Sequence, residues 1–247
     1  MTEWVCRERE GLAVKCLVVA AHPDDEVLGA GAFMYRLSQR GGEVSVCLMD
    51  GNARARSARP DDAALEHDLS SSTEKLGISR VFRGDFPNIQ MNTVPHLRMV
   101  QFIEKAVEES GAELVITHHP GDTNNDHLQT SLACQAAIRL FQRRPEVKPI
   151  REFWFMEVPS ATDWGVNQAL RPFTPNTFIE VGQEGIQRKL DALGEYRGVM
   201  RPYPHPRSAE ALMGLAAYRG AQAGVMYAEA FECAFRRGTL TCRREGG

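Results

Sequence analysis

One imidazole and three carboxylates follow directly on a short apolar run. The run Leu17–Ala21 leads into His22–Glu26, which reads His-Pro-Asp-Asp-Glu. Imidazole nitrogens and carboxylate oxygens bind catalytic divalent metals, and a neighbouring carboxylate that is not a ligand can act as a general base. Because Pro23 disfavours a helical conformation at His22, the chain is expected to turn there, at the tip of a buried strand.

A second segment of the same kind lies about a hundred residues further along the chain. The apolar stretch Glu113–Thr117 is followed by a polar run that ends in Asp126 and His127. His22 and Asp25 from the first tip, with His127 from the second, would give two neutral imidazoles and one carboxylate with open positions for water and substrate. This ligand set fits zinc and ferrous iron, and the absence of cysteines near either tip disfavours a closed structural zinc site. Of the neighbouring residues Asp24 and Asp25, only one is expected to bind the ion, which leaves the other free as a base.

Simpler roles for the same residues have to be weighed. Asp24 or Asp25 would be an ordinary N-cap of the next helix, and Asp126 would be one for the helix that contains His127. The occurrence of His and Asp at both tips favours a metal site over two unrelated caps. His118 and His119 are weaker candidates, for which structural roles are at least as plausible.

The elements around these tips predict the fold class. Strand-like and helix-like segments alternate over the first 150 residues, which is typical of a Rossmann-like α/β fold with a mostly parallel sheet and helices on both faces. Both tips then fall at the carboxyl edge of the sheet, where such folds bind their ligands. The expected strands are 17–21, 43–49, 81–83 and 113–117, and the expected helices are 27–37, 63–76, 94–109 and 126–140.

The last third of the chain is expected to cover this edge. We expect one domain over residues 1–247, in which residues 1–150 form the core with the metal site and residues 151–247 wall the cleft. The predicted elements are strands 153–159 and 177–181 and helices 184–197 and 208–219, the latter continued by a glycine-interrupted segment through Phe231. Candidate contacts for a phosphate or uronate on a substrate are Arg54, Arg56, Arg201 and Arg207.

Composition sets the remaining limits. The 247 residues are 43% hydrophobic, which is ample for a core, and the net charge of −3 with dispersed basic residues argues against a nucleic-acid-binding protein. No stretch approaches the roughly 20 apolar residues of a membrane helix, and the first residues lack the apolar core of a signal peptide, so a cytoplasmic location is expected. The six cysteines show no Cys-x-x-Cys spacing and are expected to be reduced thiols.

Taken together, these motifs resemble the PIG-L/LmbE-like family of zinc-dependent N-acetylglucosaminyl deacetylases. The resemblance rests on Ala21–Glu26, on Gly29 and Gly31, and on Asp126-His127, and it extends to the late segment Arg201–Ser208. It implies a hydrolase that removes the acetyl group from an N-acetylglucosamine-type sugar or its conjugate, giving a free amine and acetate. Relatives of this kind often assemble into trimers or hexamers, so a homo-oligomer is also implied.

The resemblance further implies residue roles. His22, Asp25 and His127 would bind Zn²⁺, with Fe²⁺ as an alternative, Asp24 would be the general base, and Asp126 would orient a ligating imidazole. Many relatives carry His-Pro-Asp-His at the second tip, where this chain has Asn124 in place of the first histidine. Asn124 can donate a hydrogen bond to an oxyanion but cannot supply a proton, so His205 is the candidate for that task.

Two other classes of function stay open from the sequence. A nucleotide-binding Rossmann oxidoreductase would fit the fold, but the turn after the first strand lacks Gly-x-Gly-x-x-Gly and carries acidic residues that would repel a pyrophosphate. A non-catalytic metal-binding protein would fit the ligands, although the retention of Asp24 beside them argues against a decayed site.

Overall fold

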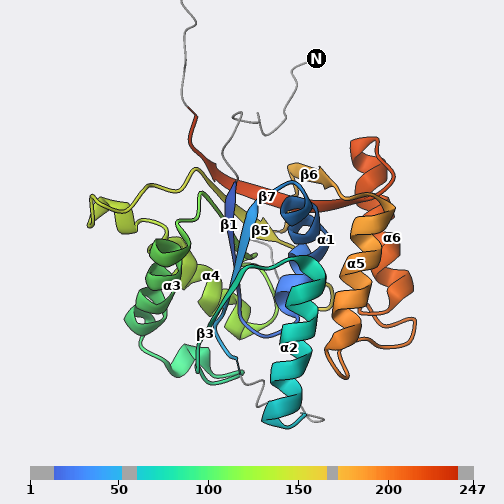
Figure 1. The fold of residues 1–247 in the computed structure, drawn as a ribbon, viewed down its shortest axis with the longest axis horizontal. Coiled ribbons are helices and arrows are strands. Elements are labelled where there is room, and N and C mark those ends of the chain that lie inside the picture. Colours follow the sequence, from blue (N-terminus) through green and yellow to red (C-terminus); the bar gives the residue numbers. More distant parts are fainter. Residues whose placement is uncertain (1–13, 52–59, 166–171, 239–247) are drawn as a thin grey trace, which may run out of the picture.

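Seven strands form one sheet in the order β3-β2-β1-β4-β5-β7-β6, as the computed structural model shows for residues 14–51, 60–165 and 172–238 (Figure 1). The first five strands in this order are parallel, and β7 runs antiparallel to both of its neighbours. The strands are β1 (Lys15–Ala20), β2 (Glu43–Leu48), β3 (Arg80–Arg83), β4 (Leu114–His118), β5 (Glu152–Met156), β6 (Thr177–Glu180) and β7 (Ala228–Arg236). The order reverses between β1 and β4, and the carboxyl ends of these two strands flank the position where doubly wound folds bind their ligands.

Helices cover both faces of the sheet, so the predicted fold class is confirmed (Figure 1). The helices are α1 (Asp25–Gln39), α2 (Asp62–Leu76), α3 (His96–Ser110), α4 (Asn125–Ala137), α5 (Gly182–Glu195) and α6 (Ala209–Ala223), with short 3₁₀ turns at Met91–Thr93 and Leu140–Gln142. Alternate residues of β1 face opposite layers: Val18 belongs to the hydrophobic cluster on the side of α1, α2, α5 and α6, whereas Val19 belongs to the cluster on the side of α3 and α4. A strand that is buried on both faces explains the uninterrupted apolar run of the sequence.

The region after α6 differs from the prediction. The glycine-interrupted segment expected through Phe231 contains a strand: the chain leaves α6 at Gly224, which has a φ of 75°, and enters β7. Alternation along Ala228–Phe231, in which Glu229 and Phe231 point to the same layer as α1, was the signal for a strand. The prediction had not assigned this strand, which the two-residue period of the sequence indicates.

The structure also bears on the predictions for membrane helices, cysteines and arginines. Among the residues that the structure describes, no helix is both long enough and apolar enough to cross a bilayer. Cys16, Cys47 and Cys134 are buried free thiols, as expected, and Cys233 is a partly buried one. Arg54 and Arg56 lie outside the described residues.

Candidate metal centre

The first strand tip is a strained turn held in place by Tyr196, the residue that follows α5. Asp24, between β1 and α1, has a φ of 108°, a conformation that costs a non-glycine residue on the order of 1–3 kcal/mol. Its backbone N–H donates to Oε2 of Glu26 at 3.0 Å, and the other oxygen of that carboxylate accepts from the hydroxyl of Tyr196 at 2.6 Å. Burial raises the pKa of Glu26 to about 8, against the opposing effect of the Tyr196 hydrogen bond. The side chain of Asp24 makes no capping hydrogen bond to α1, so the N-cap role does not account for this residue.

Two imidazole nitrogens converge on one carboxylate oxygen. Oδ2 of Asp25 lies 3.1 Å from Nδ1 of His22 and 3.1 Å from Nε2 of His127. The same oxygen accepts the backbone N–H of His22 at 3.0 Å, which fixes the carboxylate. All three side chains are buried, and one ligand atom of each lies within 4.8 Å of the others. The three residues predicted as metal ligands are therefore brought together.

Each of these imidazoles is oriented by a further carboxylate. Nε2 of His22 donates to Oδ2 of Asp126 at 3.0 Å, and Nδ1 of His127 donates to Oδ2 of Asp122 at 2.9 Å. A carboxylate on the far nitrogen fixes the ring and its tautomer, which is the usual surrounding of a metal-binding histidine. Asp126 was predicted in this position. Asp122 was missed, because an aspartate in a Gly-Asp-Thr turn reads as an ordinary turn residue; its only sequence signal was its place between the histidines.

The protonation of the cluster follows from these contacts. Burial alone would lower the pKa of His22, but the hydrogen bonds to Asp126 and Asp25 outweigh it and raise that pKa to about 10. Burial likewise opposes the charge of Asp25 and the hydrogen bond to Asp122, which together raise the pKa of His127 to about 9. For Asp25, burial acts upward, but the charge of His127 and the hydrogen bonds from both imidazoles hold the pKa well below its ordinary value. The carboxylates of the cluster therefore strongly favour positive charge at the position between them.

His118 and His119 are buried beside the cluster. The ring of His118 stacks on that of His127 with 3.8 Å between centroids, and its Nε2 accepts the N–H of Ala21 at 2.8 Å. Burial, followed by the charge of His127, lowers the pKa of His118 to about 4, so this imidazole is neutral. Nδ1 of His119 accepts the N–H of Gly121 at 3.0 Å. The contact with Gly121 supports a structural role for His119, whereas His118 also belongs, with Asp122 and His127, to a second buried group that could hold a metal ion.

The second tip begins with a capped helix. Oδ1 of Asn124 accepts the backbone N–H of Asp126 at 2.9 Å, so Asn124 is the N-cap of α4. Asp126 and His127 then lie in the first turn of that helix. The carboxylate of Asp126 also accepts the backbone N–H groups of Ile89 at 2.5 Å and Met91 at 3.0 Å, which ties the loop after β3 to the cluster.

Within the late segment Arg201–Ser208, Arg207 contacts Asp24 at the first strand tip. Its guanidinium donates to Oδ2 of Asp24 at 3.2 Å and to the hydroxyl of Ser160 at 2.9 Å. His205 is exposed, and its Nδ1 accepts the backbone N–H of Arg207 at 3.0 Å. Arg201 is also exposed.

Backbone strain is concentrated around the same cluster. Within the described ranges, the non-glycine residues with positive φ are Asp24, Ile89 with a φ of 60° and Ser160 with a φ of 77°. Ile89 donates to Asp126, which holds His22, and Ser160 accepts from Arg207, which in turn contacts Asp24. Strain of this kind accumulates at functional sites, where the surrounding structure holds it.

A comparison with protein families agrees with this geometry. Residues 17–138, which contain both strand tips, match the family model described as PIG-L, GlcNAc-PI de-N-acetylase. This part of the chain is a PIG-L domain. A relative in Escherichia coli strain K12, the uncharacterized deacetylase YaiS, is 29% identical over 191 residues, which are 73% of this chain and 89% of the relative. The family match and this relative support a deacetylase.

Solved structures share the fold of this PIG-L chain. N,N'-diacetylchitobiose deacetylase from Pyrococcus horikoshii has a TM-score of 0.70 at 19% identity, covering 90% of this chain and 84% of that one. GalB, the 4-carboxy-2-hydroxymuconate hydratase of Pseudomonas putida KT2440, has a TM-score of 0.72 at 22% identity, covering 93% of this chain and 100% of that one. A deacetylase and a hydratase with the same architecture show that the fold alone does not decide the reaction.

Proposed function

We propose that this PIG-L protein is a metal-dependent amide hydrolase that removes the acetyl group from an N-acetylglucosamine-type amino sugar or its conjugate. The observation that carries the proposal is the convergence of His22 Nδ1 and His127 Nε2 on one oxygen of Asp25, each at 3.1 Å. His22, Asp25 and His127 would bind the ion, with zinc as the first candidate and ferrous iron as the second.

The donor set fits a divalent cation on chemical grounds. Two imidazoles and one carboxylate leave coordination positions open for water and substrate. Asp126 and Asp122 hold the far nitrogens of the imidazoles, so the near nitrogens face the ion with their lone pairs once their protons have left. A dication at this position would displace the two imidazole protons that face Asp25 and carry the same total positive charge. The surrounding carboxylates already favour that charge.

The chain's own residues supply the rest of the hydrolysis. When bound, the ion supplies Lewis-acid activation of water and of the acetyl carbonyl. Asp24 is buried beside the ligand set and is not part of it, so its carboxylate is placed to take a proton from the attacking water. The water oxygen joins the acetyl carbon while Asp24 holds the water proton. The carbon–nitrogen bond then breaks as the general acid delivers a proton to the nitrogen, which gives a free amine and acetate.

Asn124 and His205 share the remaining tasks in this proposal. Because the carbonyl oxygen of the Asn124 side chain caps α4, only its amide hydrogens are available to donate to a developing oxyanion. Asn124 cannot deliver a proton, so His205 is proposed as the general acid, reaching the cleft from its exposed loop. Arg201 and Arg207, with Arg54 and Arg56, are proposed contacts for an anionic group of the substrate.

A product assay tests the proposed reaction. The protein, loaded with zinc or with ferrous iron, is incubated with a panel of N-acetylhexosamine conjugates, and acetate and amine are measured by mass spectrometry. We expect products lighter by one acetyl group, with Asp24→Asn inactive on the same panel. Addition of water to an unsaturated acid, without acetate release, would instead support a hydratase. Loss of an intact N-acetyl sugar would count against the proposal.

Two further measurements address the other classes. A tryptophan-fluorescence titration with dinucleotides would reveal a nucleotide-binding oxidoreductase. Single-turnover assays would separate a slow enzyme from a non-catalytic metal-binding protein, because a protein that binds metal and releases no acetate in one turnover is not a deacetylase.

A further inference from the structure

Helix α1, which carries Asp25, is interrupted in its first half. Ala30 has a φ of −143° and a ψ of 17°, outside the helical range. In a continuous α-helix, the N–H groups of Ala32 and Phe33 would donate to the carbonyls of Leu28 and Gly29. Here both N–H groups donate to the carboxylate of Glu229, at 3.2 Å and 2.7 Å.

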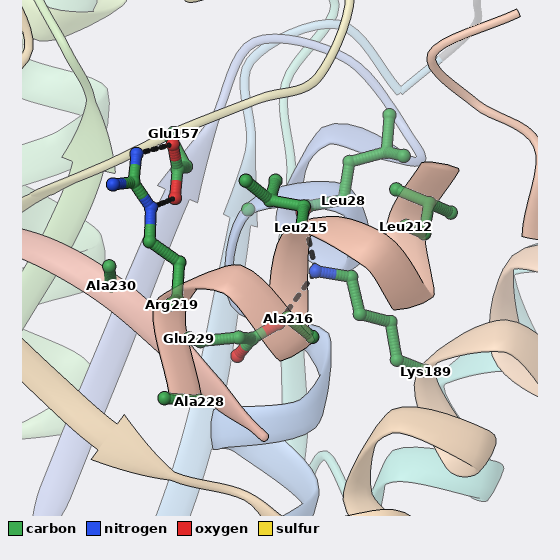
Figure 2. Close-up of a pocket in the computed structure, with 11 residues that line it drawn as sticks. Leu28, Glu157, Lys189, Leu212, Leu215, Ala216, Arg219, Ala228, Glu229 and Ala230 are labelled. Atoms are coloured by element: carbon green, nitrogen blue, oxygen red, sulfur yellow. Dashed lines mark hydrogen bonds and ion pairs between the residues drawn. The ribbon is translucent and has the colours of Figure 1, made fainter. Parts of the chain in front are cut away.

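A buried ion pair occupies the interruption. Nζ of Lys189, from α5, donates to the carbonyl of Leu28 at 2.7 Å and to Oε1 of Glu229, from β7, at 2.6 Å. Figure 2 shows the ammonium group between Leu28 and the glutamate. The side chains are each only 6% exposed. This pair, called the Lys189–Glu229 wedge below, satisfies backbone groups of α1 that an unbroken helix would pair internally.

A gain in folding stability does not explain why this ion pair is buried. Desolvating two charges costs several kcal/mol, and well-packed apolar residues in place of a buried ion pair are often as stabilising or more so. The wedge also requires space, which glycine provides: a Cβ on Gly31 would lie 3.1 Å from Cγ of Lys189 and 2.8 Å from a methyl of Val27. A Cβ on Gly29 would lie 2.4 Å from the sulfur of Met156, at the end of β5. The first turn of α1 thus packs closely against the end of β5 through Gly29, and the wedge binds the same turn through the carbonyl of Leu28.

We infer that the Lys189–Glu229 wedge positions the metal centre. By splitting α1 at Ala30, it sets the direction of the turn 25–29 independently of the rest of the helix, and this turn carries Asp25. Lys189 and Glu229 are therefore positioning residues, which act on the ion through Leu28 and the backbone of the turn. The inference rests on the proposed function in so far as Asp25 is a ligand.

The test removes both charges together, so that no unpaired buried charge is left. In Lys189→Met with Glu229→Leu, α1 loses its external partners and is free to close into a regular helix. We expect zinc affinity to fall at least about 10-fold, on the scale found for groups that orient ligands, and the visible spectrum of the cobalt-loaded protein to change. Lys189→Met with Glu229→Gln keeps an acceptor oxygen for one N–H of α1 and should recover part of the affinity.

A second ion pair supplies the matched control. Arg219 and Glu157, joined by hydrogen bonds of 2.8 Å and 2.7 Å, bridge α6 and the end of β5 beside the wedge (Figure 2). Arg219→Met with Glu157→Leu should lower the melting temperature and leave zinc affinity and the cobalt spectrum unchanged. If the wedge variant behaves like this control, losing stability without a change at the metal, the wedge is only structural and the inference is wrong.

Hydrogen exchange separates this inference from the proposed function. In the wedge variant without added metal, we expect faster amide exchange in residues 22–28 as well as at the interruption. Faster exchange confined to residues 30–34 would overturn the positioning role. If the wild-type protein binds no zinc or iron, the proposed function fails, and the exchange result still decides whether the wedge orders the turn that carries Asp25.

Discussion

The guanidinium of Arg207 lies 3.2 Å from the carboxylate of Asp24, a residue 183 positions earlier in the chain. Because Asp24 follows β1 and Arg207 precedes α6, this ion pair joins the first strand tip to the last third of the molecule. The residue proposed as general base is therefore held by a cation, as well as by the strained turn in which it lies.

Separate roles for the ligands and the base predict separate losses. His22→Ala and His127→Ala should abolish stoichiometric metal binding, because each removes one of the imidazoles that face Asp25. Asp24→Asn should retain the metal and lower turnover by about 10²–10⁴-fold, the range for a general base. Metal analysis of the purified variants, with kinetics on the same samples, measures both. Equal metal loss in all three variants would refute the assignment.

Asp122 should increase the affinity for the metal ion by orienting His127. Asp122→Asn keeps the shape of the side chain but replaces a charged acceptor of the Nδ1–H bond with a neutral one. We expect zinc affinity to fall about 10- to 100-fold, as for other groups that orient metal-binding histidines. A competition titration with a chromogenic chelator gives this ratio. The comparison variant is Asn125→Ala, at the exposed first residue of α4, which should bind zinc like the wild type.

The raised pKa values of His22 and His127 predict the pH dependence of stability without metal. Both folded-state values, about 10 and about 9, lie above the ordinary value of 6.5. Their stabilising contribution is therefore complete below about pH 6.5 and is lost as the pH rises toward 9–10. For protein kept in chelator, the free energy of unfolding should fall over this window, by up to about 1.4 kcal/mol per pH unit for each group.

Urea unfolding at several pH values measures this slope, and His127→Ala should have a smaller one. Zinc binding has the opposite trend, since the ion displaces both protons: its apparent affinity should increase from pH 6 to pH 9. A free energy of unfolding that stays constant from pH 6.5 to 9 in chelator would contradict the assigned protonation.

His205 has two separable roles, as a proton donor or as a support for Arg207. If it is the general acid, His205→Ala should lower turnover by roughly 10²-fold and remove the alkaline limb of the pH–rate profile, with metal content unchanged. His205→Asn tests the alternative, because its amide oxygen can accept the Arg207 N–H in place of Nδ1. Recovery of turnover in His205→Asn would show that His205 acts by holding Arg207. Failure of both variants supports the acid.

Much of this site can be predicted from the sequence alone, because local patterns of apolar and polar residues identify the strands and the residues at their tips. Apolar runs that end at His22 and before His127 identify buried strands and the tips that follow them, and parallel strands bring their carboxyl ends to the same edge. The alternation of strands and helices predicts the parallel part of the sheet. The C-caps Gly77 and Gly111 end α2 and α3 with positive φ, as glycine after a helix indicates.

What only the tertiary structure decided depends on long-range contacts. The pairing of Asp122 with His127, of Asp126 with His22, and of Arg207 with Asp24 requires the angles at which separate loops meet, and residue spacing does not contain these angles. The strand β7 was not predicted, because the alternation of apolar and polar residues that marks it is short. The Lys189–Glu229 wedge was invisible for the same physical reason: a lysine and a glutamate 40 residues apart become a buried pair only when α5 and β7 pack against the interruption in α1.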